Sequence, residues 1–187
     1  YYREHMHELT PLIHKERDRM IDVHHTILPL TARPRPDAAG MLGVAESLGS
    51  GLCVLSPTDM VCHSAAHLFA DGDLAGGLRN LWDIHCLLDE FGSPDFWDKL
   101  RERAARHQLS EPVERAVRLA HQLYGTEIPN GWNRWHRQDK YYGARMTARD
   151  GWGRPTRKFI RVIFYIRSHW LRMPPLMLAR HLWAKWR

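Results

Sequence analysis

Two segments near the start of the chain constrain the fold most strongly, because their side chains alternate in the way of β-strands. Residues 2–13 alternate in this way, and so do residues 20–25, Met-Ile-Asp-Val-His-His. The charged run between them, at 15–18, has the composition of a turn. The pattern predicts an antiparallel hairpin whose first strand Pro11 weakens toward a sheet edge.

The second of these segments sets an acidic side chain among aliphatic ones. Ile21 and Val23 share one face of the strand, and Asp22 and His24 share the other. We expect the two aliphatic residues to be buried and Asp22 to be a sequestered carboxylate that can hold a metal ion. Histidines of the first strand should lie close enough to contact Asp22. An ordinary polar pair of Asp22 and His24 on a solvated sheet face is the alternative.

Three blocks of sequence follow one another along the chain: IDVHH at 21–25, LSPTDMVCHSAAH at 55–67 and LRNLWDI at 78–84. Over roughly residues 3–125 they resemble an uncharacterised bacterial nucleotidyltransferase family with a DNA polymerase β-like fold. In that superfamily a Gly-Ser pair and two acidic residues come before a third acid on a later strand, and Asp22 matches the third. The first two acids have no match, so the resemblance implies an N-terminally incomplete catalytic domain that is inactive alone.

The resemblance also implies a reaction. The intact protein would move a nucleoside monophosphate from a nucleoside triphosphate (NTP) to an acceptor hydroxyl, with Mg²⁺ or Mn²⁺ held by three carboxylates. Asp22 is the expected catalytic residue and metal ligand. His24, His63 and His67 are candidates for contact with the nucleotide, and Arg79 is a further candidate if it does not form an ion pair within its helix. The acceptor and the choice of NTP stay open.

Two other places carry part of the missing motif. Gly49-Ser50 is followed by Asp59, but Val61 stands where the second acid belongs. Asp71-Gly72-Asp73 has the right spacing of acids, yet its Gly-rich surroundings predict a loop between helices. We therefore expect neither to replace the motif.

A helix is predicted to begin after Ser56, which can cap it, and to run to about Ala70. On this helix Asp59, His63 and His67 recur at intervals of four residues, which predicts one stripe. Three interpretations of the two histidines stay open: they ligate a metal ion, they contact the substrate beside the catalytic acid, or they are satisfied at a domain interface.

Further helices follow. Residues 78–88 are apolar almost all round and predict a central helix, in which we expect Arg79 and Asp83 to form a buried ion pair. A phosphate contact by Arg79 is the alternative. Two amphipathic helices are predicted before Gly125, which is a typical helix stop. Residues 126–155 mix aromatic side chains with Pro, Gly and charge, which predicts a long ordered loop or hinge.

The predicted fold class is α+β: the C-terminal part of a polymerase β-like domain, with a short antiparallel hairpin, followed by a mostly α-helical bundle. Residues 1–55 would be the remainder of the sheet and its connecting loop, and residues 56–125 the helical bundle. Residues 126–187 would form an aromatic hinge and basic C-terminal helices.

Charge divides the chain into two halves. Residues 1–93 have a net charge of −6 and residues 94–187 a net charge of +12. Residues 154–187 hold nine Lys or Arg, no acid and several aromatic side chains, which indicates contact with a membrane surface or an acidic partner. Nucleic acid and simple docking on the bundle are the alternatives. Three scattered cysteines and the lack of a membrane-length apolar run favour a cytoplasmic location, peripheral at the membrane.

Two other functions stay open. A non-catalytic helical interaction module would use the basic end to bind a membrane or a partner protein. A histidine-based metal hydrolase would draw its ligands from His5, His7, His24, His63 and His67. Dependence on magnesium or on zinc would distinguish the transferase from the hydrolase.

Overall fold

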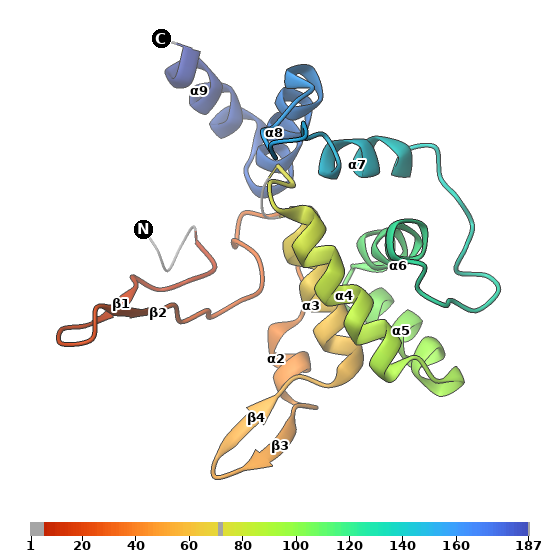
Figure 1. Cartoon of the computed structure of the whole chain (residues 1–187). Helices are drawn as coiled ribbons and strands as arrows, with labels where there is room; N and C mark the ends of the chain where they lie inside the picture. Colours follow the sequence, from red (N-terminus) through yellow and green to blue (C-terminus); the bar gives the residue numbers. More distant parts are fainter. Residues whose placement is uncertain (1–5, 71–72, 187) are drawn as a thin grey trace.

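The computed structural model describes residues 6–70 and 73–186 and shows a helical body from which two hairpins project (Figure 1). Over this part of the chain the fold is α+β and mostly helical, as predicted. The hairpins pair β1 (Leu12–His14) with β2 (Arg19–Ile21), and β3 (Glu46–Gly49) with β4 (Leu52–Val54). The helices are α2 (Ala38–Leu42), α3 (Pro57–Ala70), α4 (Gly77–Phe91), α5 (Pro94–Arg106), α6 (Ser110–Tyr124), α7 (Asp139–Met146), α8 (Lys158–Arg172) and α9 (Pro175–Trp186).

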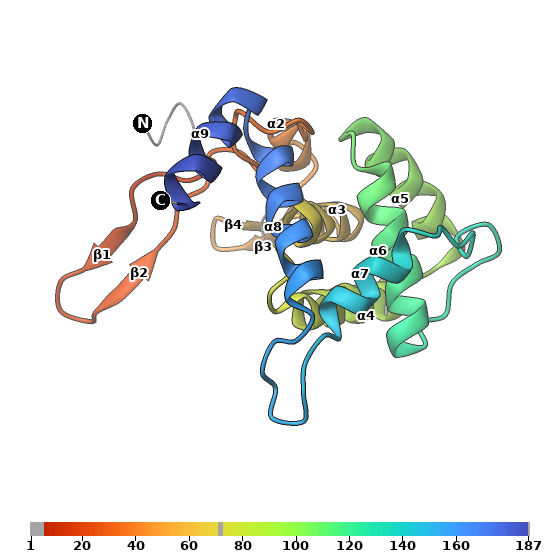
Figure 2. The same cartoon turned by 90° about the horizontal axis from the view of Figure 1, so that it is seen from above.

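Helix α3 is the centre of the body. It packs against α4, α5, α6 and α8, and α4 also packs against α6. These helices bury a continuous apolar core whose members include Val61, Leu81, Leu100, Val113 and Leu119. Both views show the β1–β2 hairpin projecting from the side of the body opposite to α5 and α6 (Figures 1 and 2). Helix α3, which carries His63 and His67, is therefore held in place by packing against four other helices.

The predicted helix boundaries in this body are confirmed. Ser56 precedes α3, and its hydroxyl oxygen accepts a hydrogen bond from the Asp59 N–H at 3.4 Å. Ser93 caps α5 in the same way, accepting from the Phe96 N–H at 3.4 Å. Gly125 ends α6 with φ 74°, a left-handed conformation that glycine adopts without steric cost.

The segment after the first hairpin does more than connect elements. The connecting loop that was predicted within residues 1–55 is partly buried, because Ala32 and Met41 lie in the core, and β3 forms within it. Strand β4 pairs with β3, and Ser50 lies in the turn between them with φ 50°. The Gly-Ser pair thus belongs to a hairpin turn. Of the two alternative acids, Asp71 lies outside the described residues, and Asp73 accepts a hydrogen bond from Nη2 of Arg145 in α7 at 2.8 Å.

The prediction of a plain loop or hinge over residues 126–155 was wrong. Helix α7 forms within it, and Trp132 and Tyr142 are buried. The Tyr142 ring makes edge-on contacts with Phe69 of α3 and Phe164 of α8, at centroid distances of 5.5 and 4.9 Å. These partners lie far away in the sequence, so local composition could not indicate that the segment would be buried.

Buried ion pairs also fix α7 to the body. Asp139 is fully buried and accepts hydrogen bonds from Nε of Arg118 at 2.6 Å and Nε of Arg115 at 3.1 Å. A buried carboxylate is costly unless it is paired, so the two arginines of α6 are needed to hold this helix in place.

The predicted basic C-terminal helices form as α8 and α9, which are separated by residues 173–174. The end of α8 is joined to the segment that leaves the first hairpin. The Thr31 hydroxyl donates to the carbonyl oxygen of Arg172 at 2.6 Å, and the Arg33 N–H donates to that of Leu171 at 2.9 Å. These bonds satisfy carbonyl groups that the last turn of a helix leaves open. None of the helices in the described part of the chain is long and apolar enough to cross a membrane.

Candidate functional site

The predicted first hairpin forms, and its base continues beyond the named strands. Leu12 pairs with Ile21, and a four-residue turn joins β1 to β2. Farther from the turn, an isolated antiparallel bridge joins Glu8 to His24. The base of the hairpin therefore places residues 7 and 8 of the first strand beside residues 24 and 25 of the second.

The register changes between the strands and this bridge. Continued from β1 and β2, the pairing would set Leu9 opposite His24, but the bridge joins Glu8 to His24. The first strand thus holds one more residue than the second over this stretch, which contains Pro11. An extra residue of this kind redirects the side chains that follow it. Strict alternation places Glu8 and His7 on opposite faces of a strand, so Glu8 was not included among the predicted site residues. Pro11 was the one signal in the sequence that the alternation is interrupted.

Four imidazoles gather where the hairpin base meets α3, counting the described residues alone. The ring centroids of His7 and His24 are 4.8 Å apart, and His67 lies 5.8 Å from the first and 6.0 Å from the second. His63 lies one helical turn from His67, at 4.5 Å. His5, which the sequence also grouped with them, lies outside the described residues.

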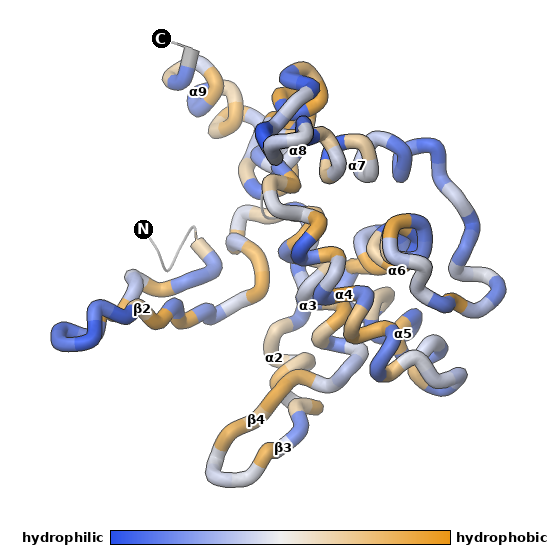
Figure 3. Tube along the Cα trace, in the orientation of Figure 1, coloured by the Kyte–Doolittle hydropathy of each residue, from blue (hydrophilic) through white to orange (hydrophobic). Residues whose placement is uncertain are grey.

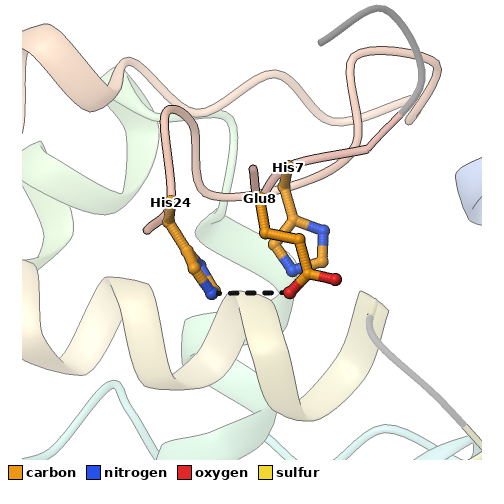
Figure 4. A group of neighbouring side chains, drawn as sticks. All are labelled: His7, Glu8 and His24. Carbon is orange, nitrogen blue, oxygen red and sulfur yellow. Dashed lines mark ion pairs between the residues drawn. The ribbon is translucent and has the colours of Figure 1, made fainter. Parts of the chain in front are cut away.

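A carboxylate joins this group of rings. The Oε2 atom of Glu8 lies 3.9 Å from Nε2 of His24, and Figure 4 shows both side chains with His7, all directed from the hairpin toward α3. One ligand atom from each of His7, Glu8 and His24 falls within 4.8 Å of the others. Among the described residues this is the group of three side chains whose ligand atoms lie close enough together to hold a metal ion.

A small cavity of about 170 Å³ adjoins the histidines. His24 and His63 line it together with apolar side chains such as Met41 and Leu55. Burial lowers the pKa of His63 to about 4, and the neighbouring His67 and His24 act in the same direction. His63 is therefore neutral at pH 7, with one ring nitrogen able to accept a hydrogen bond and the other able to donate one.

Asp22 is more accessible than the sequence predicted. It is exposed, and its neighbours Ile21 and Val23 are 63% and 38% exposed, so the prediction that they are buried was wrong. The hairpin has two strands and projects from the body, where hydrophobic residues lie along it without a covering layer (Figure 3). Asp22 stands two residues before His24 in the sequence, and its carboxylate is open to solvent.

The predicted stripe on α3 is divided between two neighbours. Asp59 is fully buried and pairs with Arg103 of α5, which donates from Nε to Oδ1 at 2.8 Å and from Nη2 to Oδ2 at 2.6 Å. Nε2 of His107 lies 3.4 Å from the same carboxylate. His63 and His67 instead lie toward the hairpin, because residues four apart on a helix are rotated by about 40° from one another. Asp59 is a structural anion.

The predicted buried ion pair on α4 was wrong. Arg79 and Asp83 are both exposed, and no ion pair joins them in this described helix. The buried face of α4 is formed by Leu81, Ile84 and Leu88, which recur at intervals of three and four. The two charged residues lie off that face and in water. A contact between Arg79 and a nucleotide stays a prediction.

The structure brings together three of the five predicted site residues: His24, His63 and His67. Asp22 lies beside them in the sequence but exposed, and Arg79 is not among the residues that line the adjoining cavity. The arrangement can bind a cation through imidazole and carboxylate groups or donate hydrogen bonds to an anionic ligand. The chemical roles of the individual residues stay predictions.

Comparison with protein families gives one match. Residues 1–125 match the family described as uncharacterised nucleotidyltransferase, and the match ends where Gly125 stops α6. No match was found among curated proteins or among solved structures. The family match spans the hairpin base, the histidines of α3 and the helices that support them. The chain therefore belongs to the uncharacterised nucleotidyltransferase family.

Proposed function

We propose that the intact protein transfers a nucleoside monophosphate from an NTP to an acceptor hydroxyl at the base of the first hairpin. The family match supports nucleotidyl transfer as the kind of activity. The observation that carries the proposal is the position of Asp22: an exposed carboxylate directly after β2 and two residues before His24, whose ring lies among the imidazoles of α3.

Mg²⁺ or Mn²⁺ is the cation that this reaction would use. Magnesium is typically bound by one or two carboxylates together with substrate phosphates and water. Asp22 fits as one protein ligand of an ion that arrives with the triphosphate, because its carboxylate is open to solvent. One carboxylate is too few for a resident magnesium ion. When bound, the cation would neutralise charge that develops on the phosphates.

The residues of the chain would bind and orient the two substrates. The imidazoles of His24, His63 and His67 can each donate an N–H to a phosphate oxygen. Arg79, exposed on α4, would add positive charge for the triphosphate. Asp22 can accept the hydrogen bond of the acceptor hydroxyl and so direct its oxygen toward the α-phosphate, provided that the two lie within hydrogen-bond reach.

The test replaces one carboxylate at nearly constant shape. In the full-length gene product we expect Asp22→Asn to lower turnover by orders of magnitude with little change in melting temperature, because Asp22 is exposed and makes no packing contribution of note. The measurement is magnesium-dependent pyrophosphate release from each of the four NTPs.

Asp18→Asn is the matched control. Asp18 lies in the turn of the same hairpin with φ 45°, a conformation that asparagine tolerates, and its loss removes the same charge four residues away. Turnover should be unchanged in this variant. Full activity of Asp22→Asn together with a lower melting temperature would make Asp22 a structural residue and defeat the proposal.

A second function is favoured by the C-terminal helices. Phe159 of α8 and Trp183 of α9 are 78% and 67% exposed, and an open apolar groove of about 660 Å³ between the helices is lined by side chains that include Val162, Ile166 and Leu182. Residues 154–187 carry nine basic side chains and no acid. We propose that this end binds an anionic lipid surface, which would place the protein at the periphery of the cytoplasmic membrane face.

Co-sedimentation with vesicles tests this second function. We expect binding to phosphatidylserine-containing vesicles, weak binding to pure phosphatidylcholine, and loss of binding at high salt. Trp183→Ala should weaken the binding. Trp152→Ala is the control, since Trp152 is more exposed than Trp183, at 87%, but lies outside both helices. Equal binding to both vesicle types, or binding to RNA in place of vesicles, would contradict the proposal.

A further inference from the structure

The hairpin base carries a set of donor atoms that the proposed transfer reaction does not need. His7 and His24 each offer an imidazole nitrogen and Glu8 offers a carboxylate oxygen, all within 4.8 Å of one another. Magnesium prefers oxygen ligands, whereas two imidazoles with one carboxylate suit zinc. The donor chemistry therefore differs from that of a nucleotide-bound cation.

The spacing of these atoms is close to that of a zinc site. Two ligand atoms on a tetrahedral zinc ion lie about 3.4 Å apart, because each bond is about 2.1 Å long. Oε2 of Glu8 and Nε2 of His24 lie 3.9 Å apart, which is too long for a hydrogen bond and leaves room for an ion between them. Rings that share a zinc ion have centroids roughly 5 Å apart, and those of His7 and His24 are 4.8 Å apart.

The side chains have the freedom to complete the site. The side chains of Glu8 and His24 are 27% and 38% exposed, so both can rotate by the small amount that coordination requires. His7 is buried and fixes the inner side of the group. From these distances and donors we propose that His7, Glu8 and His24 bind one zinc ion.

The position of this site gives the ion a mechanical role. The strands at the hairpin base are joined here by an isolated bridge, and a two-stranded hairpin alone is marginally stable. A zinc ion ligated by residues 7 and 8 on one strand and by His24 on the other would join the strands. The ring of His67 in α3 lies 5.8 Å from that of His7 and 6.0 Å from that of His24, so a zinc ion would fix the two hairpin imidazoles that face the body. Asp22, two residues from a ligand, would be positioned as a consequence.

Zinc binding can be measured without nucleotide, so its outcome is separate from that of the transfer reaction. The chain is stripped of metal with a chelator and dialysed against Zn²⁺ alone, and its zinc content is determined by elemental analysis. Co²⁺ then serves as a spectroscopic probe, because four-coordinate cobalt gives strong visible absorption. We expect one zinc ion per chain and a four-coordinate cobalt spectrum.

Two variants remove ligands, and one neighbouring histidine gives a matched control. Glu8→Gln and His24→Gln should each weaken zinc binding by about tenfold or more. His25→Gln should leave it unchanged, because His25 is adjacent and exposed but lies outside the donor group. Both ligand changes concern partly exposed side chains, so without metal the variants should melt at the same temperature as the unaltered chain. Zinc should raise the melting temperature only where all three ligands are present.

Three results would overturn the proposal: no zinc retained by the folded chain, equal losses of affinity in His24→Gln and His25→Gln, or full affinity in both ligand variants. Asp22→Asn should bind zinc normally while losing transfer activity. Loss of zinc from Asp22→Asn would show that the ligand set differs from the one proposed here.

Discussion

The helical body and the first hairpin differ in how far their apolar side chains are exposed to solvent. In the body, Leu81 and Leu100 are fully buried, whereas on the hairpin Ile13 and Ile21 are more than half exposed. Burial of apolar surface stabilises the body, but the hairpin depends on its base, where it meets α3. The region that carries the candidate chemistry is therefore the region with the least packing of its own.

The same contrast holds for charged groups. Asp59 and Arg103 form a pair between two helices of the body that is almost inaccessible to solvent. Asp22 of the hairpin and Arg79 at the surface of α4 lie in water. Charges inside the body must be paired to be tolerated, whereas the exposed charges are free to meet a ligand. Substitutions of buried charged residues should therefore lower the free energy of unfolding much more than substitutions of exposed ones.

The largest effect is expected inside the body. Arg103→Met leaves the buried carboxylate of Asp59 without its main partner, and we expect the free energy of unfolding to fall by about 3–5 kcal/mol. Combining Arg103→Met with Asp59→Leu should recover much of that loss, because no charge is then stranded. Urea unfolding measures both.

Lys99→Met is the matched control on the same helix. Lys99 pairs with Asp95 in solvent, at 2.7 Å, and exposed pairs contribute little to stability. We expect no measurable change in unfolding. Equal destabilisation by Arg103→Met and Lys99→Met would remove the distinction between buried and exposed charge.

A smaller effect is expected at His63, on the boundary between the two regions. Its pKa is about 4 in the folded protein and near 6.5 in the unfolded chain, so the unfolded chain binds more protons between these values. The stability due to neutral His63 is complete above pH 6.5 and is lost as the pH falls toward 4. After allowance for solvent screening we expect a loss on the order of 1–3 kcal/mol.

Unfolding at pH 7 and at pH 5, in the presence of a chelator, measures this effect. His63→Gln should be less sensitive to the change of pH than the unaltered chain. His136→Gln, at an exposed histidine, should keep the full sensitivity. Identical pH dependence in the two variants would mean that burial does not control the protonation of His63.

The smallest effect is expected at Arg79 and Asp83. Both are exposed on α4, so Arg79→Met and Asp83→Leu should each change the free energy of unfolding by less than about 0.5 kcal/mol. Their coupling in a double-mutant cycle should also stay below about 0.5 kcal/mol. A coupling energy several times larger would support the buried ion pair that was predicted from the sequence.

Local signals predicted the framework well. The charged turn at 15–18, the Ser56 cap and the Gly125 stop each specify an element boundary by short-range chemistry, and the structure confirms them. The alternation at 2–13 and 20–25 indicated the hairpin but not its strand boundaries, since β1 and β2 have three residues each. The histidines of α3 were grouped from their four-residue spacing, and the hairpin brings His24 to them as expected.

Long-range partners decided the features that local signals missed. Tyr142 is buried because Phe69 and Phe164 cover it, although its own segment has the composition of a loop. The spacing of Asp59 from His63 and His67 suggested a site residue. Its carboxylate instead pairs with Arg103, which is more than forty residues away in the sequence. Glu8 reaches His24 through a one-residue shift in register, which alternation alone cannot indicate.

Amide hydrogen exchange of the full-length gene product, with and without magnesium and NTP, tests the central claim most directly. The Leu9 and His25 amides, which bond across the hairpin base, should exchange more slowly when nucleotide binds, while exchange in α5 and α6 stays the same. Asp22→Asn should abolish the added protection. Nucleotide-dependent protection confined to α8 and α9, or protection that survives in Asp22→Asn, would contradict the placement of the transfer site at the junction of hairpin and α3.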